Sequence, residues 1–512
     1  MYPFKSLSLL LAICAIWIAA GCKSDTATPT GVLAHVPGTA SGVATLNIKR
    51  WMEKADFEAV KKMPFYQEML DGPGSKRPEL RRIMLDPASS GIDLEQNAYM
   101  ALEVNKDDPE ERTMYVLFSL KNAEDFAALF KDGKSGISEK NGVKTLGDPS
   151  RELVGWNKGL AVFIFSDFSE TPLQEKLLRV FDAKTVKAPA NPDMLKALDG
   201  DHDIMAWMTT DLLADNREAG AALQLIDLDP DALKNNTVHA YADFEKGRFV
   251  GHADFHLNKT FGRDFIGRFF KKEVKTDFTN MLPGEGLAFV ATMATDLRGM
   301  DQFLSERPQN RDFADYLLSE IGMNRKEMLE ILNGDMLVSA YQGGNLLGDP
   351  KLMVAAGLKS KPKAQSLLDQ MEKKGKLKKV SAGHYKVVSV GNEDFSITKS
   401  KGMGHVLLGS DQIVFSVSNE LAALIQSGKF KKADKKILQN ADNQTFSMWM
   451  DFGTDSNLLG TFQNDFLNDM QLRINGSGAD FILHTKDPDH NSLHSLFRLM
   501  DEANRQRKEV GL

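Results

Sequence analysis

Cysteine is almost absent from this sequence, which has two cysteines in 512 residues, Cys14 and Cys22. The body of the chain after Cys22 therefore contains no thiol. This excludes a disulfide framework, a cysteine-ligated zinc site and a thiol redox motif from that part of the chain. A chain of this length does not need disulfides, because its hydrophobic core is large enough to be stable alone.

Long hydrophobic runs and an excess of basic charge are missing as well. After Gly31 no apolar run is long enough to span a bilayer. The formal net charge is -7. A nucleic-acid-binding domain usually shows a basic face, so this acidic charge balance argues against a nucleic-acid-binding protein. Tyrosine (8) and tryptophan (5) are few beside phenylalanine (30). This favours core packing over a sugar-stacking platform, although five tryptophans leave room for one such site.

The N-terminus, in contrast, is typical of an export signal. Lys5 gives a short positive region, and residues 7–20 form an apolar stretch that is too short for a comfortable transmembrane helix. The stretch ends in Ala19-Ala20-Gly21, directly before Cys22. Small residues suit the narrow site of a signal peptidase, and the cysteine offers a thiol for diacylglycerol transfer. We expect residues 1–21 to be a lipoprotein signal peptide and Cys22 to be lipidated; the alternative is ordinary secretion with cleavage elsewhere.

Residues 22–31 are predicted to be the lipidated cysteine and a flexible tether, because this segment is small, polar and contains proline. Lys23 stands where an inner-membrane retention signal would place aspartate. By resemblance to the sorting rules of diderm bacteria, this favours anchoring to the outer membrane. The sequence leaves open whether the protein lies on the periplasmic or the cell-surface face of that membrane. Surface-exported lipoproteins of the Bacteroidota usually carry several acidic residues after the cysteine, whereas this tether has only Asp25.

The body of the chain contains an internal duplication. A Pro-Gly turn followed by an apolar strand occurs at residues 36–47 and again at residues 282–293. Five further pairs of similar segments follow in the same order: 99–104 with 335–340, 114–121 with 352–359, 160–165 with 412–417, 205–208 with 447–450, and 251–255 with 478–481. If the pairs come from duplication, Pro37 should fall on Pro283 and Trp207 on Trp449.

We therefore predict an α+β fold with two related lobes, residues 32–270 and 280–512. Each lobe is expected to be a mainly antiparallel sheet with helices packed on one face. The clearest hairpin is residues 241–250, with Lys246-Gly247 at the turn. Apolar and polar residues alternate along residues 238–243, as in a sheet with one covered face.

These features resemble a known group of proteins. The junction before Cys22, the tether, the strand that opens with Val36-Pro37-Gly38-Thr39-Ala40, the Trp51-containing helix and the segment Gly91-Ile92-Asp93-Leu94 are similar to uncharacterised Bacteroidota envelope lipoproteins, classed as a domain of unknown function. The resemblance covers most of the mature chain. It implies a lipoprotein of the cell envelope and supplies no catalytic residues.

The tether also holds a candidate modification site. Asp25-Thr26-Ala27 resembles the Asp-Thr-aliphatic acceptor that Bacteroidota use for O-glycosylation, and the tether is accessible. Thr26 is therefore a candidate O-glycosylation site, and an ordinary polar linker is the alternative. An intact mass of the native mature protein that shows no added mass would reject the modification.

Two pairs of histidines have a spacing that could suit metal ligands. His252 and His256 are four residues apart on a predicted strand, and His490 and His494 are four apart on a predicted C-terminal helix. Two such ligands and a carboxylate can hold zinc, but no zincin motif surrounds either pair. The sequence therefore predicts no metal and no other cofactor, and whether either pair binds metal stays open.

Duplication without a catalytic set of residues favours a non-catalytic binding or scaffold module of the cell envelope. The expected partners are the membrane, through the lipid anchor, and an envelope protein or glycan, but no nucleic acid. The alternative is a surface or periplasmic hydrolase that acts on glycans or peptides. That enzyme would need two carboxylates in a cleft, or a histidine-based site, in one lobe.

The lipid anchor can be tested directly. Because acylation needs the thiol, Cys22→Ser should leave the protein unprocessed or soluble. Membrane fractionation with metabolic lipid labelling measures this outcome. Normal labelling and a normal membrane location of the variant would contradict the prediction.

Overall fold

The computed structural model describes residues 31–71, 78–105, 108, 111–131, 136–166, 171–182, 191–214, 229–320, 322–342, 351–388, 404–434, 437, 444–452 and 466–510. The predicted signal peptide, Cys22 and Thr26 lie outside the described residues. Within these ranges, no helix combines the length and the apolar character that crossing a membrane requires.

The chain divides into two compact units: Met1–Asn258 with Asp487–Leu512, and Lys259–Lys486. The predicted lobes, residues 32–270 and 280–512, therefore need two corrections: residues 259–270 belong to the second unit, and the C-terminal segment belongs to the first. The reason for the second correction is apolar packing, because helix α18 (Ser492–Val510) contacts helix α2 (Ile48–Ala55). The ring of Phe497 lies 5.4 Å from Trp51 and 6.1 Å from Phe65.

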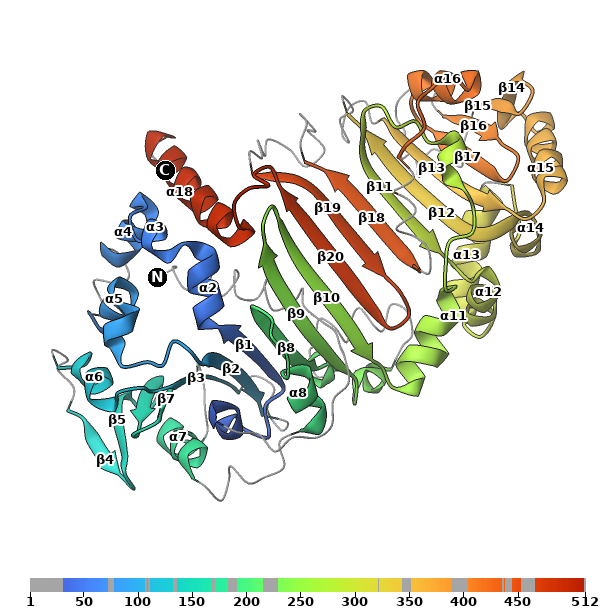
Figure 1. Ribbon diagram of the computed structural model, residues 1–512. Helices are drawn as coiled ribbons and strands as arrows, with labels where there is room; N and C mark the ends of the chain where they lie inside the picture. Colours follow the sequence, from blue (N-terminus) through green and yellow to red (C-terminus); the bar gives the residue numbers. More distant parts are fainter. Residues whose placement is uncertain are drawn as a thin grey trace. The chain divides into compact units, whose positions relative to one another are not determined.

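The first unit contains an antiparallel sheet, whose strands except β6 are labelled in Figure 1. In order across the sheet, its described strands are β4 (Ser138–Lys140), β5 (Val143–Asp148), β6 (Glu152–Trp156), β7 (Leu160–Ser166), β3 (Arg112–Ser119), β2 (Asn97–Val104), β1 (Gly42–Asn47), β8 (Ile204–Thr209), β9 (Thr237–Glu245) and β10 (Arg248–His256).

The second unit repeats this order with its own strands. They are β14 (Leu377–Ser381), β15 (His384–Val387), β16 (His405–Leu408), β17 (Gln412–Ser416), β13 (Leu352–Leu358), β12 (Leu332–Tyr341), β11 (Leu287–Ala294), β18 (Phe446–Asp451), β19 (Leu467–Ile474) and β20 (Gly478–Thr485).

The two tryptophans singled out by the sequence occupy matching register positions. Trp207 of β8 pairs with Val43 of β1, and Trp449 of β18 pairs with Val290 of β11. Both tryptophans are therefore on the strand that flanks the first strand of their unit, as the duplication hypothesis requires. This register matches Val43 with Val290, one residue away from the predicted pairing of residues 36–47 with 282–293. The strand order and this register support a common origin of the two units.

Helices cover the sheets. In the first unit they are η1 (Gly31–His35), α2, α3 (Phe57–Val60), α4 (Pro64–Asp71), α5 (Pro78–Leu85), η3 (Pro87–Ser90), α6 (Ala123–Ala128), α7 (Leu173–Phe181), α8 (Pro192–Ala197), α9 (Asp211–Ala214), η4 (Pro230–Leu233) and α18. In the second they are η5 (Lys259–Ile266), α11 (Gly267–Phe269), η6 (Phe278–Met281), α12 (Leu297–Ser305), α13 (Pro308–Glu320), α14 (Arg325–Ile331), α15 (Lys361–Lys373) and α16 (Asn419–Ser427).

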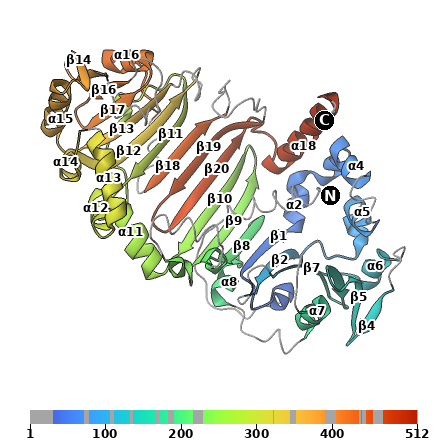
Figure 2. The same ribbon diagram turned by 180° about the vertical axis from the view of Figure 1, so that it is seen from behind.

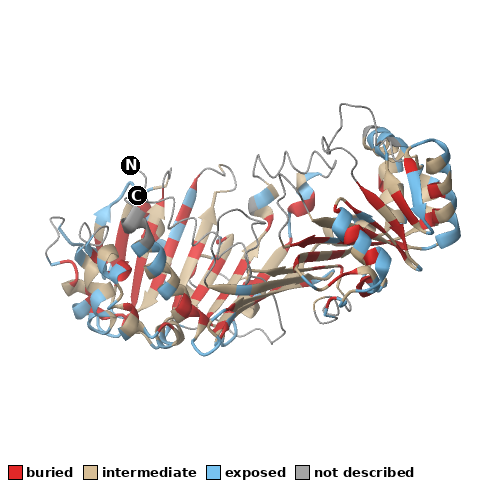
Figure 3. Cartoon of the chain, turned by 90° about the horizontal axis from the view of Figure 1, so that it is seen from above, coloured by how far each residue is buried: buried red, intermediate tan, exposed pale blue. Residues whose placement is uncertain are grey.

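The predicted α+β class with antiparallel sheets is confirmed, but helices contact both faces of the first sheet instead of one. Successive residues of β7 point to opposite faces. Val162 packs in one cluster with Leu177 of α7, and Phe163 packs in another with Phe126 of α6. Along many strands one face is nevertheless covered more completely than the other, because buried and less buried positions alternate (Figure 3).

The predicted hairpin is also confirmed. Strands β9 and β10 pair from Glu245 with Arg248 to Thr237 with His256. Gly247 at the turn has φ of 69°, a left-handed value that glycine adopts without a Cβ clash. This hairpin fixes which side chains of β9 and β10 share a face.

Phe126 offers a test of the packing. It is fully buried and makes ring contacts with Phe130, Trp156 and Phe163. Phe126→Ala should lower the free energy of unfolding of the first unit by about 3–5 kcal/mol, because it leaves a cavity. Urea unfolding measures this change.

A matched control is Phe313→Ala, since Phe313 of α13 is 60% exposed. That substitution should change the free energy of unfolding by less than about 0.5 kcal/mol. Equal effects of the two substitutions would contradict the packing.

Candidate functional site

Strands β9 and β10 and the segment before β8 bring four of the chain's ten histidines together. His202 stacks on Tyr241 with ring centroids 3.8 Å apart, and Tyr241 lies 5.3 Å from His252. His239 and His256 stack at 4.0 Å. We call His202, His239, Tyr241, His252 and His256 the histidine face.

Asp193 joins this face from helix α8, which lies beside β8 (Figures 1 and 2). The Asn191 side chain accepts a hydrogen bond from the Asp193 N–H and so caps the start of α8. Two donors hold one carboxylate oxygen: Trp207 Nε1 at 3.1 Å and Thr237 Oγ1 at 2.5 Å, both to Oδ2. The carboxylate therefore has a defined orientation toward the sheet.

The two nearest histidines approach Asp193 differently. His239 Nε2 lies 2.8 Å from Asp193 Oδ2, and His256 Nδ1 lies 3.9 Å from Oδ1. His239 is 1% exposed, whereas the side chain of His256 is 37% exposed. The cluster is thus buried on the His239 side and open to solvent at His256.

Burial and hydrogen bonding set the charge states here. Burial lowers the pKa of His239, and the neighbouring Asp193 only partly opposes this effect. Burial alone would raise the pKa of Asp193, but its contacts with Thr237, His239 and Trp207 outweigh it and lower that pKa. Near neutral pH the pair therefore consists of a neutral imidazole and a carboxylate.

The structure changes the sequence interpretation of both histidine pairs. His252 and His256 do share one face of β10, but the contacts of His256 with other potential ligands are to His239 and Asp193. No sequence pattern pointed to His239 or Asp193. His239 reads as a solvent-facing position of an alternating strand, and Asp193 reads as part of an ordinary helix start.

The other pair supports the start of α18. His490 Nδ1 lies 2.8 Å from Asp487 Oδ2, and His494 Nδ1 lies 2.8 Å from the carbonyl oxygen of Ala55. His494 therefore ties α18 to the end of α2. This is a structural role in the first unit.

The second unit carries different residues at the matching register positions. Gln471 pairs with Trp449 as His239 pairs with Trp207, and Asp469 pairs with His484 as Thr237 pairs with His256. His484 Nδ1 lies 2.9 Å from Asp469 Oδ1. Among these matched positions only His484 repeats a histidine of the first unit.

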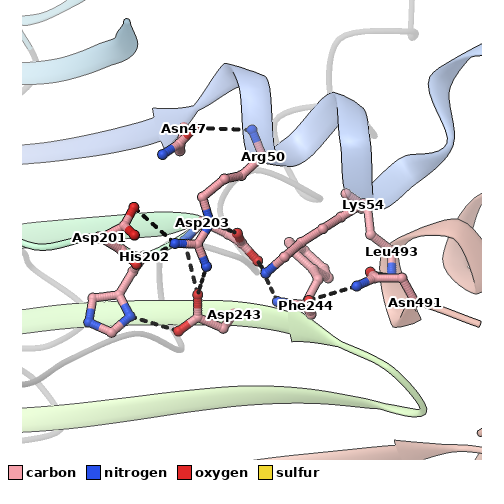
Figure 4. A network of polar contacts seen from close by, with 10 residues as sticks. All are labelled: Asn47, Arg50, Lys54, Asp201, His202, Asp203, Asp243, Phe244, Asn491 and Leu493. Carbon is pink, nitrogen blue, oxygen red and sulfur yellow. Dashed lines mark hydrogen bonds and ion pairs between the residues drawn. The ribbon is translucent and has the colours of Figure 1, made fainter. Parts of the chain in front are cut away.

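A polar network fixes the segment that carries His202 (Figure 4). The carboxylate of Asp203 is fully buried and pairs with Arg50 Nε at 3.0 Å and with Lys54 Nζ at 2.6 Å. It also accepts a hydrogen bond from the Phe244 N–H at 2.6 Å. Asp203 therefore holds α2, the start of β8 and β9 together.

The network extends to the histidine face through Asp243. One carboxylate oxygen of Asp243 accepts a hydrogen bond from the Asp203 N–H at 3.1 Å, and the other lies 2.7 Å from His202 Nδ1. Arg50 Nη2 approaches Asp243 at 3.4 Å. The position of the His202 ring on Tyr241 thus depends on the same charges that seat α2.

Asp203→Asn should destabilise the first unit. The substitution leaves Arg50 and Lys54 without their buried partner, and breaking a buried ion pair costs roughly 3–5 kcal/mol. Urea unfolding measures the loss. Asp201→Asn is the control, since the Asp201 side chain is 87% exposed and its pair with Arg50 should contribute less than about 1 kcal/mol. Similar losses in both variants would argue against the network.

Comparison with known proteins yields a family and weak structural likenesses. A family model described as Domain of unknown function (DUF4836) matches residues 34–447. No curated protein matches the chain at a significant level. Crystal forms I and III of TP0453 are each 10% identical, with TM-scores of 0.27 and 0.28. They cover 45% and 49% of this chain and 80% and 92% of theirs.

The predicted resemblance to a domain of unknown function is therefore confirmed. The Bacteroidota and lipoprotein assignments stay predictions. TM-scores of this size carry no conclusion about the site, which rests on its own geometry.

Proposed function

The chain belongs to the DUF4836 family, and we propose that it is a non-catalytic binding module of the bacterial cell envelope, anchored to the outer membrane by lipid at Cys22. The junction Ala19-Ala20-Gly21-Cys22 supports the anchor, because it combines a small-residue cleavage site with the acceptor thiol. The histidine face of the first unit supports the binding role. It gathers aromatic rings and imidazoles on adjacent strands, beside the fixed carboxylate of Asp193 on helix α8.

The burial of His239 carries the non-catalytic part of the proposal. A general base must come within about 3 Å of the proton that it removes from a substrate. His239 is the histidine that pairs with Asp193, yet it is 1% exposed, so substrate in solution does not reach it. A buried Asp–His pair of this kind favours ligand binding over catalytic turnover.

A hydrolase is the second candidate, and one observation favours it. The side chain of His256 is partly exposed and lies beside both His239 and Asp193. In a hydrolase His256 would be the group that contacts substrate, with Asp193 orienting it.

A hydrolase screen separates the two candidates. The full chain, purified in detergent, is assayed with chromogenic glycosides and fluorogenic peptides beside Asp193→Asn and the surface control Asp201→Asn. We expect all three proteins to give only background rates. General acid–base groups contribute about 10²–10⁴-fold to a rate, so turnover that falls by about 100-fold in Asp193→Asn alone would overturn the non-catalytic proposal.

A further inference from the structure

Three side chains of the histidine face have the composition of a metal site. Among the residues that the structure describes, Asp193, His239 and His256 are the one group of three or more His, Cys, Asp or Glu side chains whose ligand atoms lie within 4.8 Å of one another. They come from three elements: the start of α8, the middle of β9 and the end of β10. Sequence spacing alone could not have assembled them.

The two oxygens of Asp193 have different surroundings. Oδ2 accepts hydrogen bonds from Trp207 and Thr237 and also lies 2.8 Å from His239 Nε2. Oδ1 faces His256 Nδ1 across 3.9 Å, which is too long for a hydrogen bond. One oxygen therefore orients the carboxylate, while the other is directed to the space that it shares with His256. Partners of this kind, which orient a ligating group, are usual around protein-bound metals.

His239 supplies a second and independent observation. Its ring is almost completely buried. Nε2 lies 2.8 Å from Asp193 Oδ2 but without the geometry of a hydrogen bond, and Nδ1 has no hydrogen-bond partner among the described residues. Buried polar atoms are nearly always satisfied, so an exception in a native structure requires an explanation. The ring lies against that of His256 and next to Asp193. A cation in the space between these three side chains would give the buried imidazole a partner.

The ligand chemistry selects the class of ion. Imidazole suits Zn²⁺ and the later first-row divalent metals, whereas Mg²⁺ and Ca²⁺ prefer oxygen ligands only. Zinc bonds of about 2.0–2.1 Å place neighbouring tetrahedral ligands about 3.3 Å apart. The ligand atoms of the three side chains all lie within 4.8 Å of one another, with 2.8 Å from His239 Nε2 to Asp193 Oδ2 and 3.9 Å from His256 Nδ1 to Asp193 Oδ1. Binding one ion through a single carboxylate oxygen therefore requires these side chains to adjust.

We propose that Asp193, His239 and His256 bind one divalent transition-metal ion, for which Zn²⁺ is the best-suited probe. The inference rests on the binding role proposed above and names the class of ligand for the histidine face. Three protein ligands leave a tetrahedral ion one open position. Because His256 is partly exposed, that position faces solvent, where a donor atom from another molecule can occupy it.

The second unit provides the internal control. At the matching positions it has Gln471 in place of His239, while His484 corresponds to His256. An amide is a much poorer zinc ligand than an imidazole. The proposal therefore assigns one ion to each chain, bound by the first unit, and assigns no role in that site to His484.

Zinc binding by the tag-free full chain in detergent tests the proposal. After treatment with a chelator and dialysis against ZnCl₂, elemental analysis should find one Zn²⁺ per chain, and calorimetry should give its affinity. His256→Gln should weaken binding by at least about 10-fold, since even partners that only orient a ligand contribute 10- to 100-fold. His484→Gln should bind as the parent does.

Folding is checked separately. His256 is partly exposed, so His256→Gln should melt near the parent in the absence of metal. Added Zn²⁺ should raise the melting temperature of the parent and of His484→Gln but not that of His256→Gln, because an ion bound only to the folded state stabilises it. Thr237→Val retains all three ligands and should weaken Zn²⁺ binding less than His256→Gln does.

Two results would overturn the metal site: no Zn²⁺ retained by the parent, or equal retention by the parent and His256→Gln. Either result leaves the proposed binding function standing, because that function fails on a different observation, turnover that depends on Asp193. The zinc-binding measurement and the hydrolase screen therefore test the metal site and the binding function separately.

Discussion

The arrangement of the first unit depends on a carboxylate that has no contact with water. An ionised carboxylate in the interior is costly unless cations and N–H groups surround it. Asp203 obtains these from Arg50 and Lys54 of α2 and from the Phe244 N–H of β9. Neither element can shift without leaving a charge unpaired. Because β9 also carries His239, the seating of α2 and the geometry of the candidate site share one constraint.

The two units show how the same strand order can carry different polar side chains on the sheet surface. Their strand orders are the same, and Trp207 and Trp449 occupy matching register positions. The backbone ladders and the buried apolar positions define the fold, whereas polar positions on the sheet are freer to vary. His239 in one unit and Gln471 in the other differ in this way. The chemistry of the first unit is therefore separable from the architecture that the units share.

The histidine face is also where local rules of protein stability are broken. The buried ring of His239 has a nitrogen, Nδ1, without a hydrogen-bond partner among the described residues, which lowers stability, and natural proteins concentrate such departures at functional sites. The surroundings supply compensation, because Trp207 and Thr237 fix the Asp193 carboxylate beside it. A partly open cluster of this kind is compatible with the binding role proposed for the first unit.

Local patterns in the sequence determined much of the architecture. Turn residues and alternation located the β9–β10 hairpin around Gly247, and the repeated segments predicted which strands correspond, because both signals arise from neighbouring residues. Only the tertiary structure decided that α18 belongs to the first unit, since its apolar residues could have packed on either core. It also decided that His239 is buried and meets Asp193 and His256. Helix α8 covers that face of the sheet, and contacts between residues far apart in the chain leave no local pattern by which to predict them.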